Sequence, residues 1–200
     1  MPILYIIAGP PGIGKSTTGK NFLPTNIETL NHDKFLQYYK VNESTNYEEL
    51  SNLKANEFIQ EQLKEGRDFG IELNLGYDSH FDLLRFVKSQ YPNYKINVCL
   101  YYTVDIQICI DRATIREKSG GHSVSEKVIH EMYENTIPLI QSNAHLIDGI
   151  RLVDISYSFI DLAFELNPDQ NILFINSNLP KWITENFPKI VELKTKKARP

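Results

Sequence analysis

The sequence predicts an α/β fold in which a mostly parallel central sheet is flanked by helices. Three observations support this prediction. Residues 3–8 form a continuous apolar run rich in β-branched and aromatic side chains, which is typical of a strand buried on both faces of a parallel sheet. A glycine-rich segment and a helical stretch follow this run directly. Further strand and helix patterns then alternate up to residue 156.

The elements of the first half follow from hydrophobic patterning and from signals at their ends. They are predicted, in chain order, as a strand at 3–8, a helix at 15–22, a strand at 27–30, a helix at 46–65 and a strand at 69–73. Thr45 and Glu48 have the spacing of a capping box at the start of the long helix. Gly66 stands where the C-terminal cap of that helix belongs.

The second half continues the alternation and then changes character. Its elements are predicted as a helix at 79–90, a strand at 95–102, a helix at 105–118, a helix that starts after the capping-box pair Ser123 and Glu126, and a strand at 152–156. Two apolar runs, at 160–166 and 172–175, flank a turn at 167–169 and predict a β-hairpin. We therefore expect a core at 1–156 and a C-terminal extension at 157–200 that packs on it, with the hairpin as an appendage.

Composition and charge narrow the class of protein. The 200 residues are 42% hydrophobic and 23% charged, and 21 basic against 25 acidic residues give a net charge of −4. This acidic balance, without a basic stripe, disfavours nucleic-acid binding. The longest apolar run near the start is too short to span a membrane and has no cationic segment before it, and Cys99 and Cys109 are isolated. We therefore expect a cytoplasmic protein with reduced cysteines and no membrane partner.

A phosphate-binding pattern, G-x-x-x-x-G-K-[ST], occupies residues 9–16 between a predicted strand and a predicted helix. Glycine backbones can point N–H groups at phosphate oxygens, and a helix N-terminus favours anions. Lys15 is expected on the β- and γ-phosphates and the Ser16 hydroxyl on Mg²⁺, so ATP and Mg²⁺ are the expected cofactors. The alternative is a glycine turn beside a surface lysine. The residues expected to bind the nucleotide are Gly9, Pro10, Pro11, Gly12, Ile13, Gly14, Lys15, Ser16 and Thr17.

Acidic residues mark the next two strands, near the sheet edge where parallel α/β folds bind ligands. Asp33 is expected to accept a proton from a substrate hydroxyl, and the alternative is that Asp33 caps a helix. Glu72 interrupts an apolar strand, where a carboxylate is costly without a cation or hydrogen-bond donors. It is therefore expected near Mg²⁺ or a substrate hydroxyl, unless it lies on an edge strand and is simply solvated. Asn74, two residues further along, is also expected to contact the substrate.

Two arginines stand out because they have no acidic neighbour on their own helix. Arg112 and Arg116 lie four residues apart, and neither has a carboxylate three or four positions away. Such cations suit a phosphate group delivered from elsewhere, so both are expected to stabilise the transferring phosphoryl group. The following Gly120-Gly121 pair suggests the hinge of a lid around residues 112–125. Long-range ion pairing or a solvated face is the alternative.

Together these motifs resemble the zeta toxin family of P-loop kinases, in particular its shorter bacterial branch often labelled predicted ABC-type ATPases. The resemblance covers residues 3–156 and rests on the loop at 9–16, the N-x-D-x-F pattern at 31–35, Glu72, and the run from Arg112 through Gly120-Gly121-His122-Ser123-Val124 to Tyr133. It implies a P-loop NTPase fold, ATP and Mg²⁺, Lys15 on the phosphates, Asp33 as base and arginines on the transferring group. Characterised members phosphorylate a hydroxyl of UDP-N-acetylglucosamine and are blocked by an antitoxin, which implies a UDP-sugar acceptor and an antitoxin partner.

The leading hypothesis is an ATP- and Mg²⁺-dependent phosphotransferase that phosphorylates a hydroxyl of a small molecule, with a UDP-sugar as one acceptor. The chain departs from the family pattern at residues 73–75, where relatives carry threonines, and at Met132, where arginine is common. These departures favour a second hypothesis, a nucleotide-binding regulatory or interaction module with weakened catalysis. A nucleic-acid 5′-hydroxyl kinase is a third hypothesis, which the acidic balance disfavours.

Overall fold

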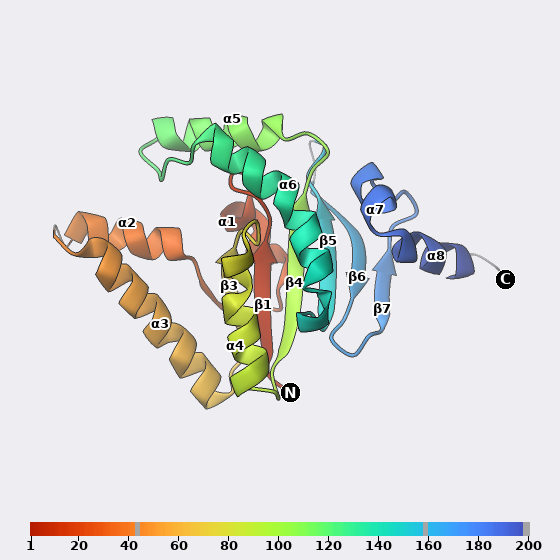
Figure 1. The fold of residues 1–200 in the computed structure, drawn as a ribbon, viewed down its shortest axis with the longest axis horizontal. Helices are drawn as coiled ribbons and strands as arrows, with labels where there is room; N and C mark the ends of the chain where they lie inside the picture. Colours follow the sequence, from red (N-terminus) through yellow and green to blue (C-terminus); the bar gives the residue numbers. More distant parts are fainter. Residues whose placement is uncertain (43–44, 158–159, 198–200) are drawn as a thin grey trace.

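A seven-stranded sheet organises the computed structural model, which describes residues 1–42, 45–157 and 160–197 (Figure 1). The strands are β1 (Ile3–Ala8), β2 (Glu28–Leu30), β3 (Phe69–Leu73), β4 (Lys95–Tyr102), β5 (Gly149–Asp154), β6 (Asp161–Leu166) and β7 (Ile172–Ile175). Their spatial order is β2-β3-β1-β4-β5-β6-β7. The first five strands pair in parallel, whereas β6 and β7 are antiparallel. The predicted hairpin is confirmed, but it continues the central sheet instead of forming a separate appendage.

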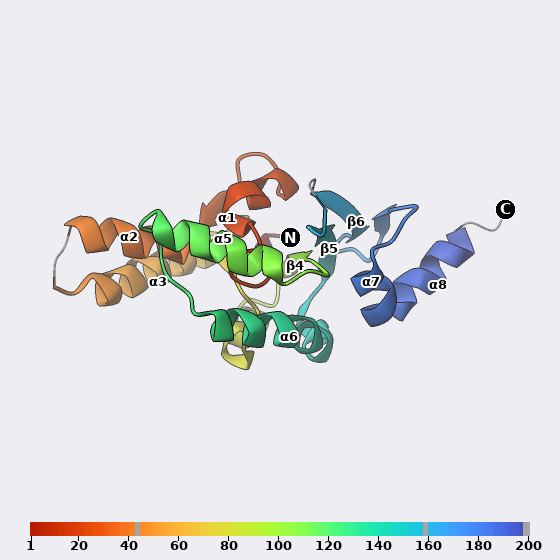
Figure 2. The same ribbon diagram turned by 90° about the horizontal axis from the view of Figure 1, so that it is seen from above.

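Helices lie on both sides of this sheet. They are α1 (Lys15–Thr18), α2 (His32–Asn42), α3 (Tyr47–Glu65), α4 (Asp82–Gln90), α5 (Gln107–Lys118), α6 (Glu126–Ser142), α7 (Lys181–Asn186) and α8 (Pro188–Lys197). Seen from above, α4 and α6 lie on one side of the sheet and α1 lies on the other (Figure 2). Helix α5 crosses over the carboxyl edge of the parallel strands (Figure 1). None of the described helices is long and apolar enough to cross a membrane.

Side-chain alternation in β1 divides the apolar interior into two cores. Leu4 and Ile6 belong to the core that includes residues of α4 and α6, whereas Ile7 belongs to the core that includes Cys109 of α5. Because β1 is buried on both faces, its sequence shows a continuous apolar run instead of alternation. Cys99 and Cys109 are both buried and free, as predicted.

The ends of two helices differ from the predicted capping boxes. Asn46 precedes α3 as its N-cap and no side chain caps that helix, so the prediction for Thr45 is wrong. The N-cap of α6 is Ser125, whose hydroxyl accepts a hydrogen bond from the backbone N–H three residues later, and the prediction for Ser123 is also wrong. In each case several polar residues stand near the helix start, and sequence spacing alone does not choose among them. Gly66 closes α3 in the left-handed conformation at φ 64°, as predicted.

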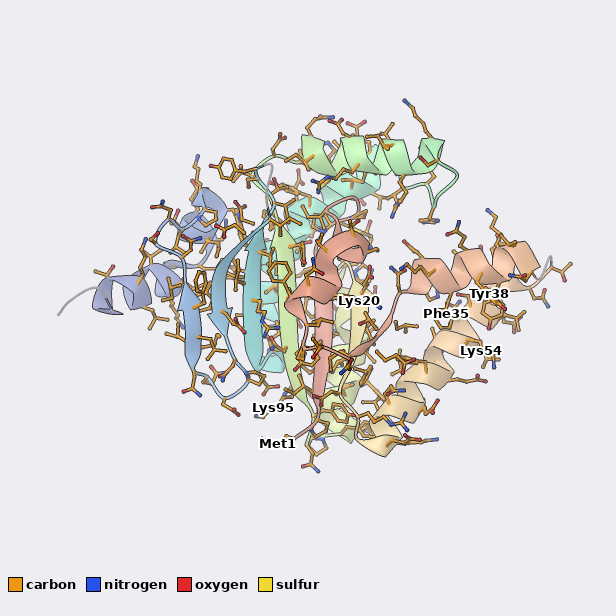
Figure 3. The ribbon with its side chains drawn as sticks, turned by 180° about the vertical axis from the view of Figure 1, so that it is seen from behind. Met1, Lys20, Phe35, Tyr38, Lys54 and Lys95 are labelled. Atoms are coloured by element: carbon orange, nitrogen blue, oxygen red, sulfur yellow. The ribbon has the colours of Figure 1, made fainter. Side chains whose placement is uncertain are left out.

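Helix α2 is the main element that hydrophobic patterning does not predict. None of its residues is fully buried, so it shows only a weak apolar stripe. It packs against α3, and the two helices form an arm that stands to one side of the sheet (Figure 1). Figure 3 labels Phe35 and Tyr38 on α2 and Lys54 on α3. The start of α2 lies beside the carboxyl edge of the sheet, which brings Asp33 to that edge.

Trp182 ties the C-terminal helices to the sheet. Its side chain is buried, its Nε1–H donates to the Asp154 carboxylate at 2.8 Å, and its ring lies 5.2 Å from the ring of Tyr102. Asp154 ends β5 and Tyr102 ends β4, so this one side chain contacts the ends of two neighbouring strands. The segment after the hairpin is thereby packed on the core.

Candidate active site

A cleft of about 780 Å³ opens at the carboxyl edge of the parallel strands. Its walls come from the loop at 9–16, the start of α2, the end of β3 with the loop that follows, and the helices α5 and α6. Most residues predicted for the site line this cleft, namely Pro11, Gly12, Gly14, Lys15, Ser16, Thr17, Asp33, Glu72, Asn74, Arg112 and Arg116. Gly9, Pro10 and Ile13 do not line it and instead support the residues that do.

The glycine loop is seated closely against β4 and α5. A Cβ atom at Gly9 would lie 2.4 Å from the Tyr101 carbonyl oxygen, and one at Gly12 would lie 2.1 Å from the Cys109 carbonyl oxygen. Both glycines have positive φ values, 138° and 79°, which other residues rarely adopt. Glycine is therefore required at these two positions by close packing against β4 and α5, and it also leaves the loop N–H groups accessible to phosphate oxygens.

The Lys15 ammonium is surrounded by neutral oxygens. Its Nζ donates to the carbonyl oxygens of Gly9 at 2.6 Å and Pro10 at 3.0 Å, and to Oδ1 of Asn74 at 2.7 Å. Burial lowers the pKa of Lys15 to about 8, because loss of solvation outweighs the attraction of Glu72 and other acidic groups. The charge of Lys15 is thus poorly compensated in the ligand-free protein. Phosphate oxygens would supply the missing negative charge.

Ser16 joins the ends of β2 and β3 through its hydroxyl. That hydroxyl donates to Oε2 of Glu72 at 2.5 Å and accepts from Nδ2 of Asn31 at 2.9 Å. Hydroxyl and carboxylate oxygens are ligands that Mg²⁺ prefers, so the donor set fits the metal role predicted for Ser16 and Glu72. Strand β3 lies between β2 and β1, so the alternative of a solvated Glu72 on an edge strand is wrong.

Asn31 is a site residue to which sequence reasoning gave no role of its own. Its side chain is mostly buried, and its Oδ1 accepts from the Lys34 backbone N–H at 3.1 Å, which makes Asn31 the cap of α2. The alternative in which Asp33 is the cap is therefore wrong, because Asp33 lies inside the first helical turn. The signal was present in the N-x-D pattern, since asparagine is a preferred cap and acids favour the first turn.

The two arginines reach the cleft from α5 in different ways. Arg112 Nη1 donates to the Ile13 carbonyl oxygen at 3.0 Å, so it braces the glycine loop. Arg116 Nη1 lies 3.7 Å from Oδ2 of Asp33, which is the long-range ion pair that the alternative interpretation anticipated. The Nε of Arg116 is buried and finds no hydrogen-bond partner within the described part of the chain. Arg116 also lines the cleft, so its guanidinium group can contact an anion that binds there.

A further wall of the cleft is formed where the loop after β3 meets α6. A Cβ at Gly76 would lie 2.6 Å from Cβ of Met132, and the Tyr77 hydroxyl donates to Oε2 of Glu131 at 3.0 Å. Met132, identified from sequence only as a departure from a family pattern, is 8% exposed and packs this wall together. His80 also lines the cleft, and no local sequence signal identifies it.

The chain is similar to known proteins in structure but not in sequence. No family model and no curated protein sequence matches the chain. Several solved structures are similar to this chain. A chain of the AvrRxo1-ORF1:-ORF2 complex with ATP matches at TM-score 0.65 and 12% identity, over 98% of this chain and 63% of that chain. A chain of the PezAT chromosomal toxin-antitoxin system of Streptococcus pneumoniae matches at TM-score 0.57 and 13% identity, over 98% of this chain and 84% of that chain. A candidate kinase from Chloroflexus aurantiacus matches at TM-score 0.54 and 16% identity, over 66% of this chain and 78% of that chain.

The chain shares the fold of these solved structures. The predicted fold class, a mostly parallel sheet with helices on both faces and a C-terminal hairpin, is confirmed by the sheet order and by these similarities. The resemblance identified from the sequence motifs is confirmed at the level of the fold. The chain spans 63% of the length of the AvrRxo1-complex chain, so that protein has additional structure beyond the matched part.

Proposed function

We propose that the protein is an ATP- and Mg²⁺-dependent kinase that transfers the γ-phosphoryl group of ATP to a hydroxyl of a small molecule. The observation that carries this proposal is the pairing of Asp33 with Arg116 at 3.7 Å on the rim of the same cleft that contains the glycine loop and Lys15. Phosphoryl transfer needs a base for the attacking hydroxyl beside cations that stabilise the transferring group.

Each residue has a distinct part in the proposed reaction. Lys15 and the loop N–H groups bind the phosphates, and Ser16 with Glu72 would hold Mg²⁺, which neutralises charge on the phosphate oxygens. Asp33 accepts the proton of the attacking hydroxyl while the hydroxyl oxygen forms a bond to the γ-phosphorus. The bond between this phosphorus and the bridging oxygen breaks, and ADP leaves. Arg112 and Arg116 stabilise the negative charge on the group in transit.

The acceptor and partner follow from resemblance and are part of the proposal. The motifs shared with zeta toxins support a UDP-sugar as a candidate acceptor, and the similarity to the PezAT chain supports an antitoxin as a candidate protein partner. We further propose a core at 1–156 with a lid around 112–125, an extension at 157–200, and a cytoplasmic location. The acidic composition supports the absence of a nucleic-acid partner.

The test is a transfer assay with an unbiased acceptor pool. The pure protein is incubated with γ-labelled ATP, Mg²⁺ and a small-molecule extract of cells, and the Lys15→Ala variant serves as control. A labelled small molecule that is absent with Lys15→Ala supports the kinase, and its mass identifies the acceptor. ATP binding by calorimetry without any labelled product would contradict the kinase and support a nucleotide-binding regulatory module.

A further inference from the structure

Each charged side chain in the described lining of the cleft contacts another group of the site. The described lining contains three cations, Lys15, Arg112 and Arg116, and two carboxylates, Asp33 and Glu72. Lys15 and Arg112 donate to loop carbonyls, Glu72 accepts from Ser16, and Arg116 pairs with Asp33. The phosphates of ATP would therefore use the positive charge that this cleft offers.

Another part of the cleft lining is built from uncharged side chains. We define the acceptor wall as Leu73, Asn74, His80, Val124, Val128 and Met132, all of which line the cleft. Leu73 ends β3, and Asn74 and His80 lie in the stretch between β3 and α4. Val124 lies just before α6, and Val128 and Met132 lie within that helix. The contacts of Gly76 with Met132 and of Tyr77 with Glu131 join the two segments into one surface. The exposed rim beside this wall adds only imidazole and hydroxyl groups, those of His122, Ser123 and Ser125.

His80 contributes a neutral hydrogen-bonding group to the acceptor wall. Its Nδ1 accepts from the backbone N–H of Tyr77 at 3.3 Å, which places the ring proton on Nε2. Burial and the nearby Lys15 charge lower the pKa of His80 below its ordinary value, so the ring is uncharged at neutral pH. The Asn74 amide is the second polar group of this wall, and its Oδ1 already accepts from Lys15.

An anionic acceptor would find no partner on this wall. With ATP bound, a second phosphate or a carboxylate would lie near Asp33 and Glu72 without a cation of its own, and burial of an unpaired charge is strongly unfavourable. Hydroxyl groups, in contrast, can pair with the amide and imidazole groups, while Val128 and Met132 contact the apolar face of a ring.

We propose that the acceptor is an uncharged polyhydroxy compound of the sugar, polyol or nucleoside type that carries no phosphate or carboxylate group. The inference rests on the proposed kinase function and narrows it, because it removes sugar nucleotides from the candidate acceptors. The product is the phosphate monoester of a hydroxyl on a molecule that was neutral before transfer.

Splitting the acceptor pool by charge tests this inference separately from the kinase itself. The cell extract is passed over an anion-exchange resin, and the unretained and retained pools are each assayed with γ-labelled ATP, Mg²⁺ and the Lys15→Ala control. Labelled product from the unretained pool alone is the expected result. Product from the retained pool alone overturns the inference and leaves the kinase proposal intact. Absence of product from both pools overturns both proposals.

A charge placed on the acceptor wall tests whether this wall causes the discrimination. Val128→Lys adds a cation to the α6 side of the wall, and Val128→Gln is the matched uncharged control. The two compounds compared are the identified acceptor and a derivative that carries a phosphate on a hydroxyl other than the one that is phosphorylated. Val128→Lys should reduce the preference for the neutral compound, measured as a ratio of kcat/KM values, by about tenfold. Val128→Gln should leave the ratio near that of the unchanged protein. Equal ratios in both variants overturn the role of the wall, and a thermal unfolding midpoint near that of the unchanged protein shows that each variant is folded.

Discussion

Affinity for MgATP should fall as the pH rises above 8, because the bound phosphates need the charged form of Lys15. The pKa of Lys15 in the ligand-free protein is about 8, lowered mainly by burial. Phosphate binding favours the ammonium form and raises this pKa. Near or above pH 8 the protein must therefore take up protons when it binds MgATP. The free energy needed to protonate Lys15 makes the observed binding free energy less favourable.

The magnitude follows from the pKa. With a value of about 8, roughly nine-tenths of the Lys15 side chains are charged at pH 7 and roughly one-tenth at pH 9. If neutral Lys15 contributes little to phosphate binding, affinity should be about tenfold weaker at pH 9 than at pH 7. Cys109, whose pKa burial raises to about 11, and His80, whose pKa is lowered, do not titrate between these pH values.

Calorimetry measures both quantities in one experiment. MgATP is titrated into the protein from pH 7 to pH 9, at each pH in two buffers that differ in ionisation enthalpy, so that the proton uptake is obtained with the affinity. Lys15→Arg is the control, because a guanidinium stays charged from pH 7 to pH 9. The MgATP affinity of this variant should therefore not change with pH, whether that affinity is high or low. An affinity that is constant from pH 7 to pH 9 for the unchanged, folded protein would refute the reasoning.

Three further predictions concern the base, the loop and the metal side of the cleft. Asp33→Asn should abolish phosphoryl transfer and leave MgATP affinity within a few fold, as measured by transfer assay and calorimetry. Gly12→Ala should lower the free energy of unfolding in urea by about 2 kcal/mol more than Gly66→Ala, because both residues have positive φ but only the first meets backbone atoms. Asn31→Ala and Asn31→Ser should both raise the Mg²⁺ concentration needed for half-maximal activity, because both variants lose the hydrogen bond to Ser16. Only Asn31→Ala should also lower the free energy of unfolding, by about 1 kcal/mol, because serine can still cap α2.

Each of these predictions has an outcome that contradicts it. Full transfer activity in Asp33→Asn would show that another group takes the proton. Equal stability of Gly12→Ala and Gly66→Ala would show that the loop can move away from α5. A Mg²⁺ requirement of Asn31→Ser that matches the unchanged protein would show that Ser16 is oriented without Asn31.

Local signals explain why the nucleotide side could be predicted from sequence. The apolar run of β1 and the glycine pattern after it are adjacent in the chain, and the close approaches at Gly9 and Gly12 require glycine at those positions. Glu72 was informative for a related reason, because a carboxylate inside an apolar strand must have polar partners. One residue, or one short segment, was sufficient for each of these inferences.

Other features depend on partners far away in the sequence and could not be predicted. The Arg116–Asp33 pair joins α5 to α2, and the antiparallel pairing of β6 with β5 turns an expected appendage into part of the sheet. Helix α2 has no fully buried residue, so its pattern is weak. The hydrogen bond from Asn31 to Ser16 joins residues that are 15 positions apart in the chain. A residue with neutral chemistry, such as His80, gives no local signal at all.

Met132 shows how the structure changes the meaning of a sequence difference. Seen in sequence, the absence of a cation at this position suggested weakened catalysis. In the structure, Met132 packs against Gly76 with no room for a Cβ between them, and so it holds the loop after β3 against α6. The groups proposed to be catalytic, Asp33, Lys15 and Arg116, line the same cleft as this packing. An apolar residue at this position therefore favours a change of acceptor, from an anionic to a neutral compound, over a loss of phosphoryl transfer.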